Sequence, residues 1–281
     1  MDELAAKQVL LDFEIIILIA TAMGLLFYHL KDKWFPRELI PTDHEFDRFD
    51  LILMWFPALL FLSYPALAVA SVKMDLNGEV EAPEPSIFSV LFSLISFGIV
   101  WFFVYIIMEW IRNRRIVDWF GLRAMSLPKV VIATIIGGVI SLVICALFIG
   151  HLSQNFLEGV FGPLDQQEAV QMVQSSNSVA YLILTIVTAC IAAPLAEEFL
   201  FRGYIYGALK QKTGKLFAMV VVGGIFAAVH GNLPALVPLW AFSILLCISY
   251  EITKSLWVPI GIHAIFNATN IVMMLTPQAA E

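Results

Sequence analysis

Long uninterrupted runs of apolar residues constrain this chain more than any other feature. A helix needs about 20 mostly apolar residues to cross roughly 30 Å of hydrocarbon, and the sequence contains several runs of that length. A spanning β-barrel would instead show short segments of alternating apolar and polar residues. Apolar residues make up 60% of the chain and charged residues 14%, against about 45–50% and 25% in soluble domains. We therefore expect an all-α, polytopic helical membrane protein.

About eight transmembrane helices fit the pattern of apolar runs and breaks. We expect them at 9–30, 51–72, 87–111, 128–150, 179–200, 216–231, 234–250 and 256–275. A tight turn at Gly231 and Pro234 is expected to separate the sixth span from the seventh. Residues 151–178 contain no Lys or Arg, so we expect an exterior loop there, with a short surface helix over residues 164–174.

The distribution of positive charge predicts the orientation of the chain. When loops are assigned to alternating sides, all 16 Lys and Arg residues except Lys7 and Lys73 fall on one side. Positive residues concentrate on the cytoplasmic side of membrane proteins. We therefore expect both termini outside, in an integral multi-pass protein of a bacterial cytoplasmic membrane. The expected partners are the lipid bilayer and a protein or peptide substrate, with no nucleic acid among them.

Three charged residues interrupt the fifth span. Ionisable side chains inside a membrane are costly, and they usually face the protein interior with a partner. Glu198 and Arg202 are four residues apart, which places them on one helical face and predicts a structural ion pair. Glu197 lies about 100° further around the helix and points elsewhere. Because it has no partner in its own helix, Glu197 is the better candidate for a working carboxylate.

Two histidines in the last apolar block complete a candidate site. His230 ends the sixth span one turn after Phe226, and His263 and Asn267 share one face of the last span. A single helical histidine is more often a core residue than a catalyst, but the joint pattern with the glutamates indicates function. At 1.5 Å per residue, Glu197, His230 and His263 all fall in the middle to outer part of the membrane, where they could meet.

These residue types suit peptide hydrolysis without a covalent enzyme intermediate. A carboxylate and a neutral imidazole can activate a water molecule, while a second imidazole and an amide N–H donate to the oxyanion that forms. Alternatively, Glu197, His230 and His263 could bind zinc, which would activate the water instead. The HExxH motif is absent, so the spacing requires no metal, and we expect no cofactor.

Three short motifs resemble those of a known family. They are EEFLFR at 197–202, FAAVH at 226–230 and HAIFN at 263–267, in this order across three late spans. They are similar to the motifs of the CPBP family of CAAX proteases and bacteriocin-processing proteins, also called the ABI family, which includes the type II CAAX prenyl endopeptidases. The lead-in TKSLWVPIGI resembles the start of the family's last motif. The resemblance covers about residues 128–275, so we expect a protease core at 128–281 and a three-span accessory region at 1–127.

The resemblance implies an all-helical intramembrane endopeptidase that acts on a membrane-associated protein or peptide, in CAAX-type or bacteriocin-type processing. By motif position, Glu197 and His230 would activate water, and His263 and Asn267 would form the oxyanion site. Glu198 and Arg202 would be the second glutamate and the arginine of the first motif. The alternatives are a zinc metalloprotease, a non-catalytic immunity or scaffold protein of the same fold, and a proton-coupled transporter. The sequence shows no pair of related halves, which many transporters have.

Overall fold

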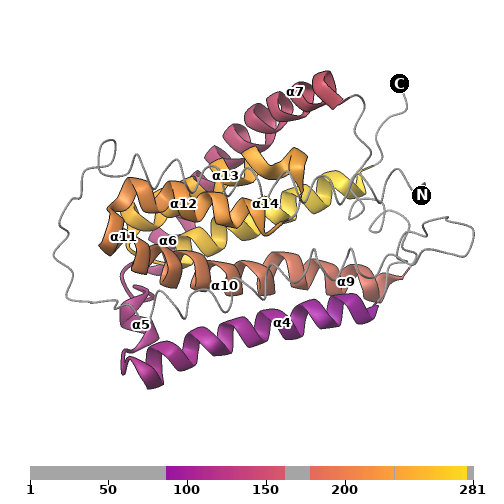
Figure 1. Ribbon diagram of the computed structural model, residues 1–281. Coiled ribbons are helices and arrows are strands. Elements are labelled where there is room, and N and C mark those ends of the chain that lie inside the picture. The colour runs from indigo at the N-terminus through magenta and orange to yellow at the C-terminus, as the bar shows by residue number, and fades with distance from the viewer. Residues whose placement is uncertain (1–86, 162–177, 231, 277–281) are drawn as a thin grey trace, which may run out of the picture. The chain divides into compact units, whose positions relative to one another are not determined.

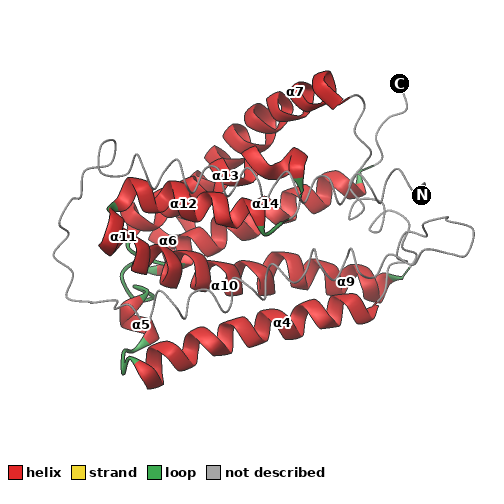
Figure 2. Ribbon diagram, viewed as in Figure 1, coloured by secondary structure: helices red, strands yellow, loops and turns green. Residues whose placement is uncertain are grey.

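A computed structural model describes residues 87–161, 178–230 and 232–276 of the 281-residue chain. These ranges form helices joined by short turns and contain no strand (Figures 1 and 2). Five helices among them are long and apolar enough to cross a membrane. The expected class, a helical membrane protein, is confirmed. The spans expected at 9–30 and 51–72, and the surface helix expected at 164–174, lie outside the described residues.

The helices follow the apolar runs of the sequence. In chain order they are α4 (Ile87–Tyr105), α5 (Ile116–Trp119), α6 (Leu127–Ser141), α7 (His151–Phe161), α9 (Val179–Val187), α10 (Ala193–Glu198), α11 (Gly207–Thr213), α12 (Lys215–Ala228), α13 (Leu233–Thr253) and α14 (Trp257–Leu275). Four π-helical stretches extend or join them, at Ile106–Ile111, Leu142–Gly150, Thr188–Ala192 and Phe199–Tyr206. The π-helical turns keep several neighbouring helices continuous, which makes the spans longer than the individual helices.

The candidate spans agree with the expected ones at most of their ends. They are Ile87–Ile111, Leu127–Phe156, Val179–Thr213, Pro234–Thr253 and Trp257–Leu275. The helix expected at 216–231 is α12, which has 14 residues. At 1.5 Å per residue it is about 21 Å long, shorter than the hydrocarbon core. The total of eight spans therefore stays a prediction.

Two expectations about segment ends were wrong. Residues 151–161 form helix α7 where an exterior loop was expected. The Ser153 hydroxyl donates a hydrogen bond of 3.1 Å to the carbonyl of Pro234, near the start of α13, and this contact anchors the helix. The fifth span does not end near residue 200 but continues to Thr213, because π-helical turns carry the helix past the charged motif.

The described residues belong to two compact units that alternate along the chain. We call them the glutamate unit, which contains 87–143, 156–161, 178–200 and 249–276, and the arginine unit, which contains 144–155, 201–230 and 232–248. The first carries Glu197, Glu198, His263 and Asn267, and the second carries Arg202 and His230. The expected boundary near residue 128 separates an accessory region from a protease core, whereas these units are groups of residues in mutual contact. That boundary stays a prediction.

Small residues bring two helices of the glutamate unit close together. Helix α14 packs along α6, and α4 lies beside α9 and α10 (Figure 1). A Cβ atom on Gly261 would lie 2.6 Å from Cγ2 of Thr134, and one on Gly137 would overlap the side chain of Ile262. Membrane helices commonly approach each other through such small residues, because lipid supplies no hydrophobic drive for their association. The α6–α14 contact thereby fixes the helix that carries His263.

The arginine unit has its own close helix contact. The indole N–H of Trp240 on α13 donates a hydrogen bond of 2.9 Å to the carbonyl of Val220 on α12. A Cβ atom on Gly223 would lie 2.6 Å from Cδ1 of the same ring. Glycine at 223 therefore leaves the space into which the Trp240 ring packs, and the N–H of this half-buried indole has an acceptor.

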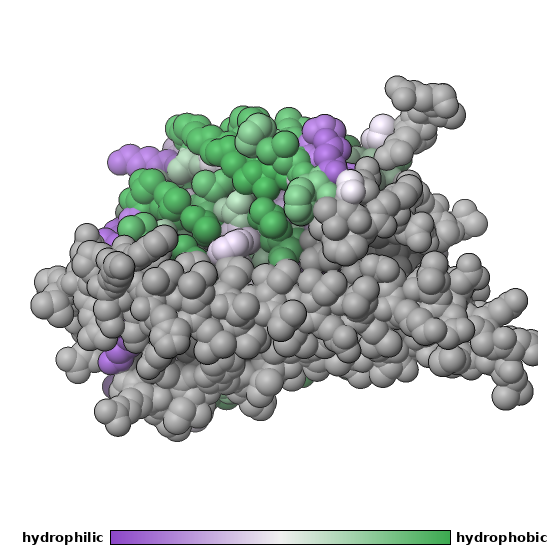
Figure 3. Space-filling view, turned by 45° about the horizontal axis from the view of Figure 1, so that its top comes forward, coloured by the Kyte–Doolittle hydropathy of each residue, from purple (hydrophilic) through white to green (hydrophobic). Residues whose placement is uncertain are grey.

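Much of the described surface is apolar (Figure 3). Phe88, Ile132 and Phe156 are 77%, 59% and 71% exposed, and similar side chains occur on most of the long helices. Soluble monomers rarely expose large contiguous apolar patches. On helices of membrane-spanning length, these side chains are suited to face lipid.

We expect the Gly261→Leu variant to unfold at a lower temperature than wild type in detergent. A leucine there overpacks the α6–α14 contact, and overpacking typically costs about 1–3 kcal/mol. Gly98→Leu is the matched control, since a Cβ atom on Gly98 of α4 has no atom within 4 Å. Equal melting temperatures for the two variants would contradict the close helix contact.

Candidate active site

The two glutamates of the first motif are buried at the end of α10. Glu197 is 6% exposed and Glu198 is fully buried. Helix α10 lies between the π-helical stretches Thr188–Ala192 and Phe199–Tyr206. Such turns are rare in proteins and occur frequently at functional sites. The glutamate pair thus lies inside an irregular stretch of an otherwise continuous helix.

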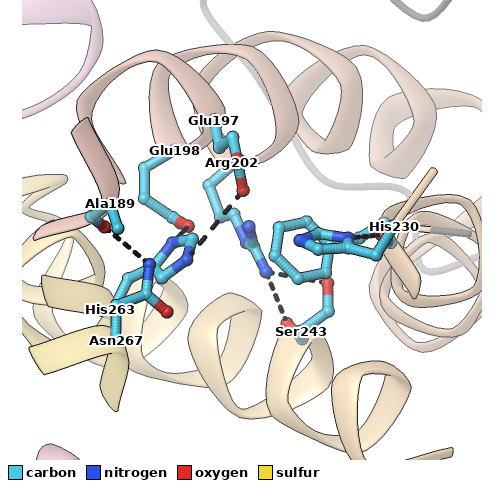
Figure 4. A network of polar contacts seen from close by, with 9 residues as sticks. Ala189, Glu197, Glu198, Arg202, His230, Ser243, His263 and Asn267 are labelled. Atoms are coloured by element: carbon cyan, nitrogen blue, oxygen red, sulfur yellow. Dashed lines mark hydrogen bonds and ion pairs between the residues drawn. The ribbon is translucent and has the colours of Figure 1, made fainter. Parts of the chain in front are cut away.

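The imidazole of His263 lies between the two carboxylates (Figure 4). Its Nδ1 is 2.8 Å from Oε1 of Glu198, a hydrogen bond that joins α14 to α10. Its Nε2 is 3.9 Å from Oε2 of Glu197. His263 is itself only 3% exposed. One buried ring is therefore flanked by an acidic group at each nitrogen.

The proton positions follow from which atoms can donate. An ionised carboxylate only accepts hydrogen bonds, so Nδ1–H of His263 donates to Glu198 and Nε2 faces Glu197. The 3.9 Å between Nε2 and Oε2 of Glu197 is too long for a direct hydrogen bond. Among the described residues, that carboxylate oxygen has no hydrogen-bond partner. A small polar molecule such as water could bridge the two atoms.

Sequence spacing missed this contact. Glu198 and His263 are 65 positions apart, and no helical periodicity relates residues in different helices. We expected Glu197 to point away from Glu198. This was wrong, since the two carboxylates lie near the two nitrogens of the same imidazole, that of His263. The signal that could have found it is the shared depth of the glutamates and His263 in the membrane.

Asn267 connects α14 to the helix that precedes α10. Its Nδ2 donates a hydrogen bond of 2.7 Å to the carbonyl of Ala189, in the π-helical stretch before α10 (Figure 4). The side chain lies one turn after His263, as its spacing predicts. A primary amide has two N–H groups, so this contact leaves a second donor for another acceptor.

Arg202 is fully buried in the arginine unit. Its Nη2 donates to the hydroxyl of Ser243 at 2.7 Å and to the carbonyl of Ser243 at 3.3 Å. Its guanidinium carbon is 4.5 Å from the centre of the Phe226 ring, a cation–π arrangement. Ser243 is fully buried too, and sequence reasoning did not select it because an isolated serine in an apolar run carries no signal. The Glu198–Arg202 ion pair stays a prediction.

Phe226 also positions His230, one turn later on the same helix. Nδ1 of His230 is 2.6 Å from the carbonyl oxygen of Phe226, and the two ring centres are 4.7 Å apart. A carbonyl oxygen only accepts, so Nδ1 carries the proton and Nε2 of the neutral ring is an acceptor. The ring is exposed. The expected cooperation of His230 with Glu197 stays a prediction.

The donor set of the glutamate unit does not fit a catalytic zinc ion. Such a site commonly has three protein ligands and one open position. Within this unit only Glu197 and His263 face a common gap, and the other nitrogen of His263 is hydrogen-bonded to Glu198. Across the part of the chain that the structure describes, no group of three His, Cys, Asp or Glu residues is arranged to hold a metal. The expected absence of a metal cofactor stays a prediction.

Comparison with known proteins agrees with the motif resemblance. Residues 179–269, which contain all three motifs, match the family model described as "Type II CAAX prenyl endopeptidase Rce1-like". The resemblance is thereby confirmed for this stretch. The Bacillus subtilis (strain 168) protein named "Putative membrane peptidase YdiL" is 33% identical over 134 residues, which are 46% of this chain. The chain spans 55% of the length of that relative. No solved structure matches.

We expect Glu198→Ala to lower the melting temperature, and Glu198→Gln to lower it less. The alanine leaves the Nδ1–H of His263 buried without its acceptor, which costs about 1–3 kcal/mol. The glutamine can still accept that hydrogen bond through its amide oxygen. Asp118→Ala is the control, because Asp118 and Arg115 form a pair in which both side chains are exposed, and exposed pairs contribute little. If Glu198→Ala is as stable as this control, the contact with His263 is not structural.

Proposed function

We propose that this chain is an intramembrane endopeptidase that hydrolyses a peptide bond of a membrane-associated protein or peptide. The observation that carries the proposal is the buried imidazole of His263, with Glu198 at one nitrogen and Glu197 facing the other. The family-model match over residues 179–269 and the similarity to a protein named as a membrane peptidase support it. The substrate class is a prenylated CAAX-type protein or a bacteriocin-type precursor.

Glu197 is the general base in this proposal. Its Oε2 faces Nε2 of His263 across 3.9 Å, and a water molecule in that gap would donate a hydrogen bond to the carboxylate. Glu197 would take a proton from this water as the water attacks the substrate carbonyl, and would return it to the amine that leaves when the C–N bond breaks. The apolar surroundings favour the role, because few competing water molecules solvate the carboxylate there. The predicted part of His230 in this step rests on the motif order alone, and a neutral ring bound through Nδ1 to the carbonyl of Phe226 would offer Nε2 as an acceptor.

His263 and Asn267 stabilise the oxyanion in this proposal. Nδ1–H of His263 is already used by Glu198, so donation to the oxyanion requires a proton on Nε2 as well. With Nδ1 bonded to Glu198, a proton on Nε2 would be directed toward the developing negative charge. The N–H of Asn267 that does not bind Ala189 is the second donor. Preorganised donors of this kind lower the barrier to acyl transfer.

We expect Glu197→Gln to abolish proteolysis and to leave folding intact. The amide keeps the shape of the side chain but cannot take a proton from water. The measurement compares the peptides in membranes from cells that produce wild type or the variant, and one precursor should accumulate with the variant. Glu251→Gln is the control for loss of a negative charge, since it lies outside the proposed site.

Two results would decide against this proposal. Identical peptide profiles in membranes with wild type, with Glu197→Gln and from cells that lack the protein would favour the non-catalytic immunity or scaffold protein. Normal cleavage of a precursor by purified Glu197→Gln, with the wild-type melting temperature, would exclude Glu197 as the base and leave the protease assignment standing.

We expect cleavage to survive treatment with a chelator followed by gel filtration. The same preparation should contain well under one zinc per chain, because water is activated by Glu197 rather than by a metal. His263→Ala and Asn267→Ala should each lower kcat by roughly 100- to 1,000-fold, the usual effect of losing one oxyanion donor. Stoichiometric zinc that cannot be removed without loss of activity, together with a near-normal Asn267→Ala, would establish the zinc alternative.

A further inference from the structure

A strongly basic segment of the glutamate unit lies between two candidate membrane spans. Residues 112–129, which we call the basic segment, contain five basic residues and one acidic residue in a chain whose net charge is −7. The segment follows the span Ile87–Ile111 directly and runs into the span Leu127–Phe156. Because both neighbouring helices are long enough to cross the membrane, the segment lies at a membrane surface.

Most of the basic side chains project from this segment into the surroundings. Arg114, Arg115, Arg123 and Lys129 are exposed. The acidic residue, Asp118, lies 3.8 Å from Arg115 in an exposed pair, and such pairs are weak. The positive charge of the segment is therefore largely uncompensated within the segment.

The backbone of the basic segment is fixed against the protein. Phe120 is fully buried and its ring centre lies 5.1 Å from that of Phe199, in an edge-to-face arrangement. The carbonyl of Phe120 accepts a hydrogen bond of 3.1 Å from the N–H of Leu256. Oε1 of Glu109 accepts another, of 2.8 Å, from the N–H of Ile116. A segment held at these points presents its arginines with little further ordering, which favours binding.

Two tryptophans place the segment at the level of lipid headgroups. Trp110 is 78% exposed, directly before the segment. The guanidinium carbon of Arg114 lies 5.9 Å from the centre of the Trp119 ring. Tryptophan is enriched at membrane–water interfaces, where its amphipathic ring fits between hydrocarbon and headgroups. An arginine beside such a ring is at the right depth to reach lipid phosphates.

We propose that the basic segment is a binding site for anionic phospholipids, with its arginines bound to the lipid phosphate groups. Four of its five basic residues are arginine, whose planar guanidinium binds phosphate through two parallel hydrogen bonds. Positive charge that only sets the orientation of the chain in the membrane can come from lysine as well as arginine, and it does not require a fixed backbone. Phe199, which packs on Phe120, directly follows Glu198. Lipid bound here therefore stabilises the helix that carries the glutamate pair.

The test uses the full-length chain, purified in an uncharged detergent. Phosphatidylglycerol or phosphatidylcholine is titrated in, and the melting temperature is measured. We expect a saturable rise in melting temperature with phosphatidylglycerol and none with phosphatidylcholine, since a ligand that binds only the folded state stabilises it. The rise should disappear near 1 M salt, where the Debye length falls to about 3 Å. Inorganic phosphate at the same concentration should give no comparable rise.

Matched variants separate this site from general electrostatic attraction. In Arg114→Gln/Arg115→Gln/Arg123→Gln, the apparent affinity for phosphatidylglycerol should fall about fivefold for each charge removed, about 100-fold in total. Lys210→Gln/Lys212→Gln/Lys215→Gln removes the same charge elsewhere and should bind as wild type does. Arg114→Lys/Arg115→Lys/Arg123→Lys keeps the charge, and its affinity should lie between those of wild type and the variant with the three arginines replaced by glutamine.

Several outcomes would overturn the proposal. Equal loss of affinity in the two glutamine variants would mean that only net charge matters. An equal rise with phosphatidylcholine would mean that any bilayer lipid suffices, and an equal rise with inorganic phosphate would assign the segment to a free anion. The variant with the three arginines replaced by glutamine could be unstable without lipid. In that case, the affinity of the arginine-to-lysine variant is compared with that of wild type, and this comparison decides whether the arginines bind phosphate. Equal affinities of those two would exclude arginine-specific binding of phosphate.

Discussion

The hydrogen bond between Glu198 and His263 is the interaction on which the glutamate unit depends. Burying a carboxylate or an imidazolium without a partner is expensive in a low-dielectric interior. At 2.8 Å, Nδ1 of His263 bonds to Oε1 of the fully buried Glu198, and the contact ties α14 to α10. It also directs the second nitrogen of the ring toward Glu197. One contact thus offsets a burial cost, joins two helices and orients the group best suited to chemistry.

Close helix packing keeps that contact in place. Gly261 lies two residues before His263 and faces Thr134 of α6, so the backbone of α14 comes nearer to α6 than a larger side chain would allow. One turn beyond His263, Asn267 is bound to the carbonyl of Ala189. The histidine is therefore restrained on both sides along its own helix. A ring restrained in this way can place its proton reproducibly, which is what preorganised catalysis requires.

Helix positions and candidate residues were predictable from sequence, but partners were not. Apolar runs located Ile87–Ile111 and Trp257–Leu275 almost to the residue, because a span must bury its backbone in hydrocarbon and the lipid sets its length. Helical spacing also placed His263 and Asn267 on one face. Spacing predicted Arg202 as a partner of Glu198, which stays a prediction, but it gave no sign of the contact between Glu198 and His263. Partners on different helices depend on tertiary packing, which a single sequence does not encode by periodicity.

A buried site of this kind needs a rigid frame, and the frame reaches the membrane surface through aromatic packing. Phe199 follows Glu198 in the chain, and its ring contacts both Phe120 of the connection between α4 and α6 and Trp101 of α4. Aromatic pairs in this geometry contribute about 0.5–1.5 kcal/mol beyond their buried area. Displacing Phe120 would remove one wall around Phe199 and free the turn that directly follows the glutamates. The charged surface and the buried carboxylates are therefore parts of one packed structure, since the same phenylalanine pair fixes the backbone of both.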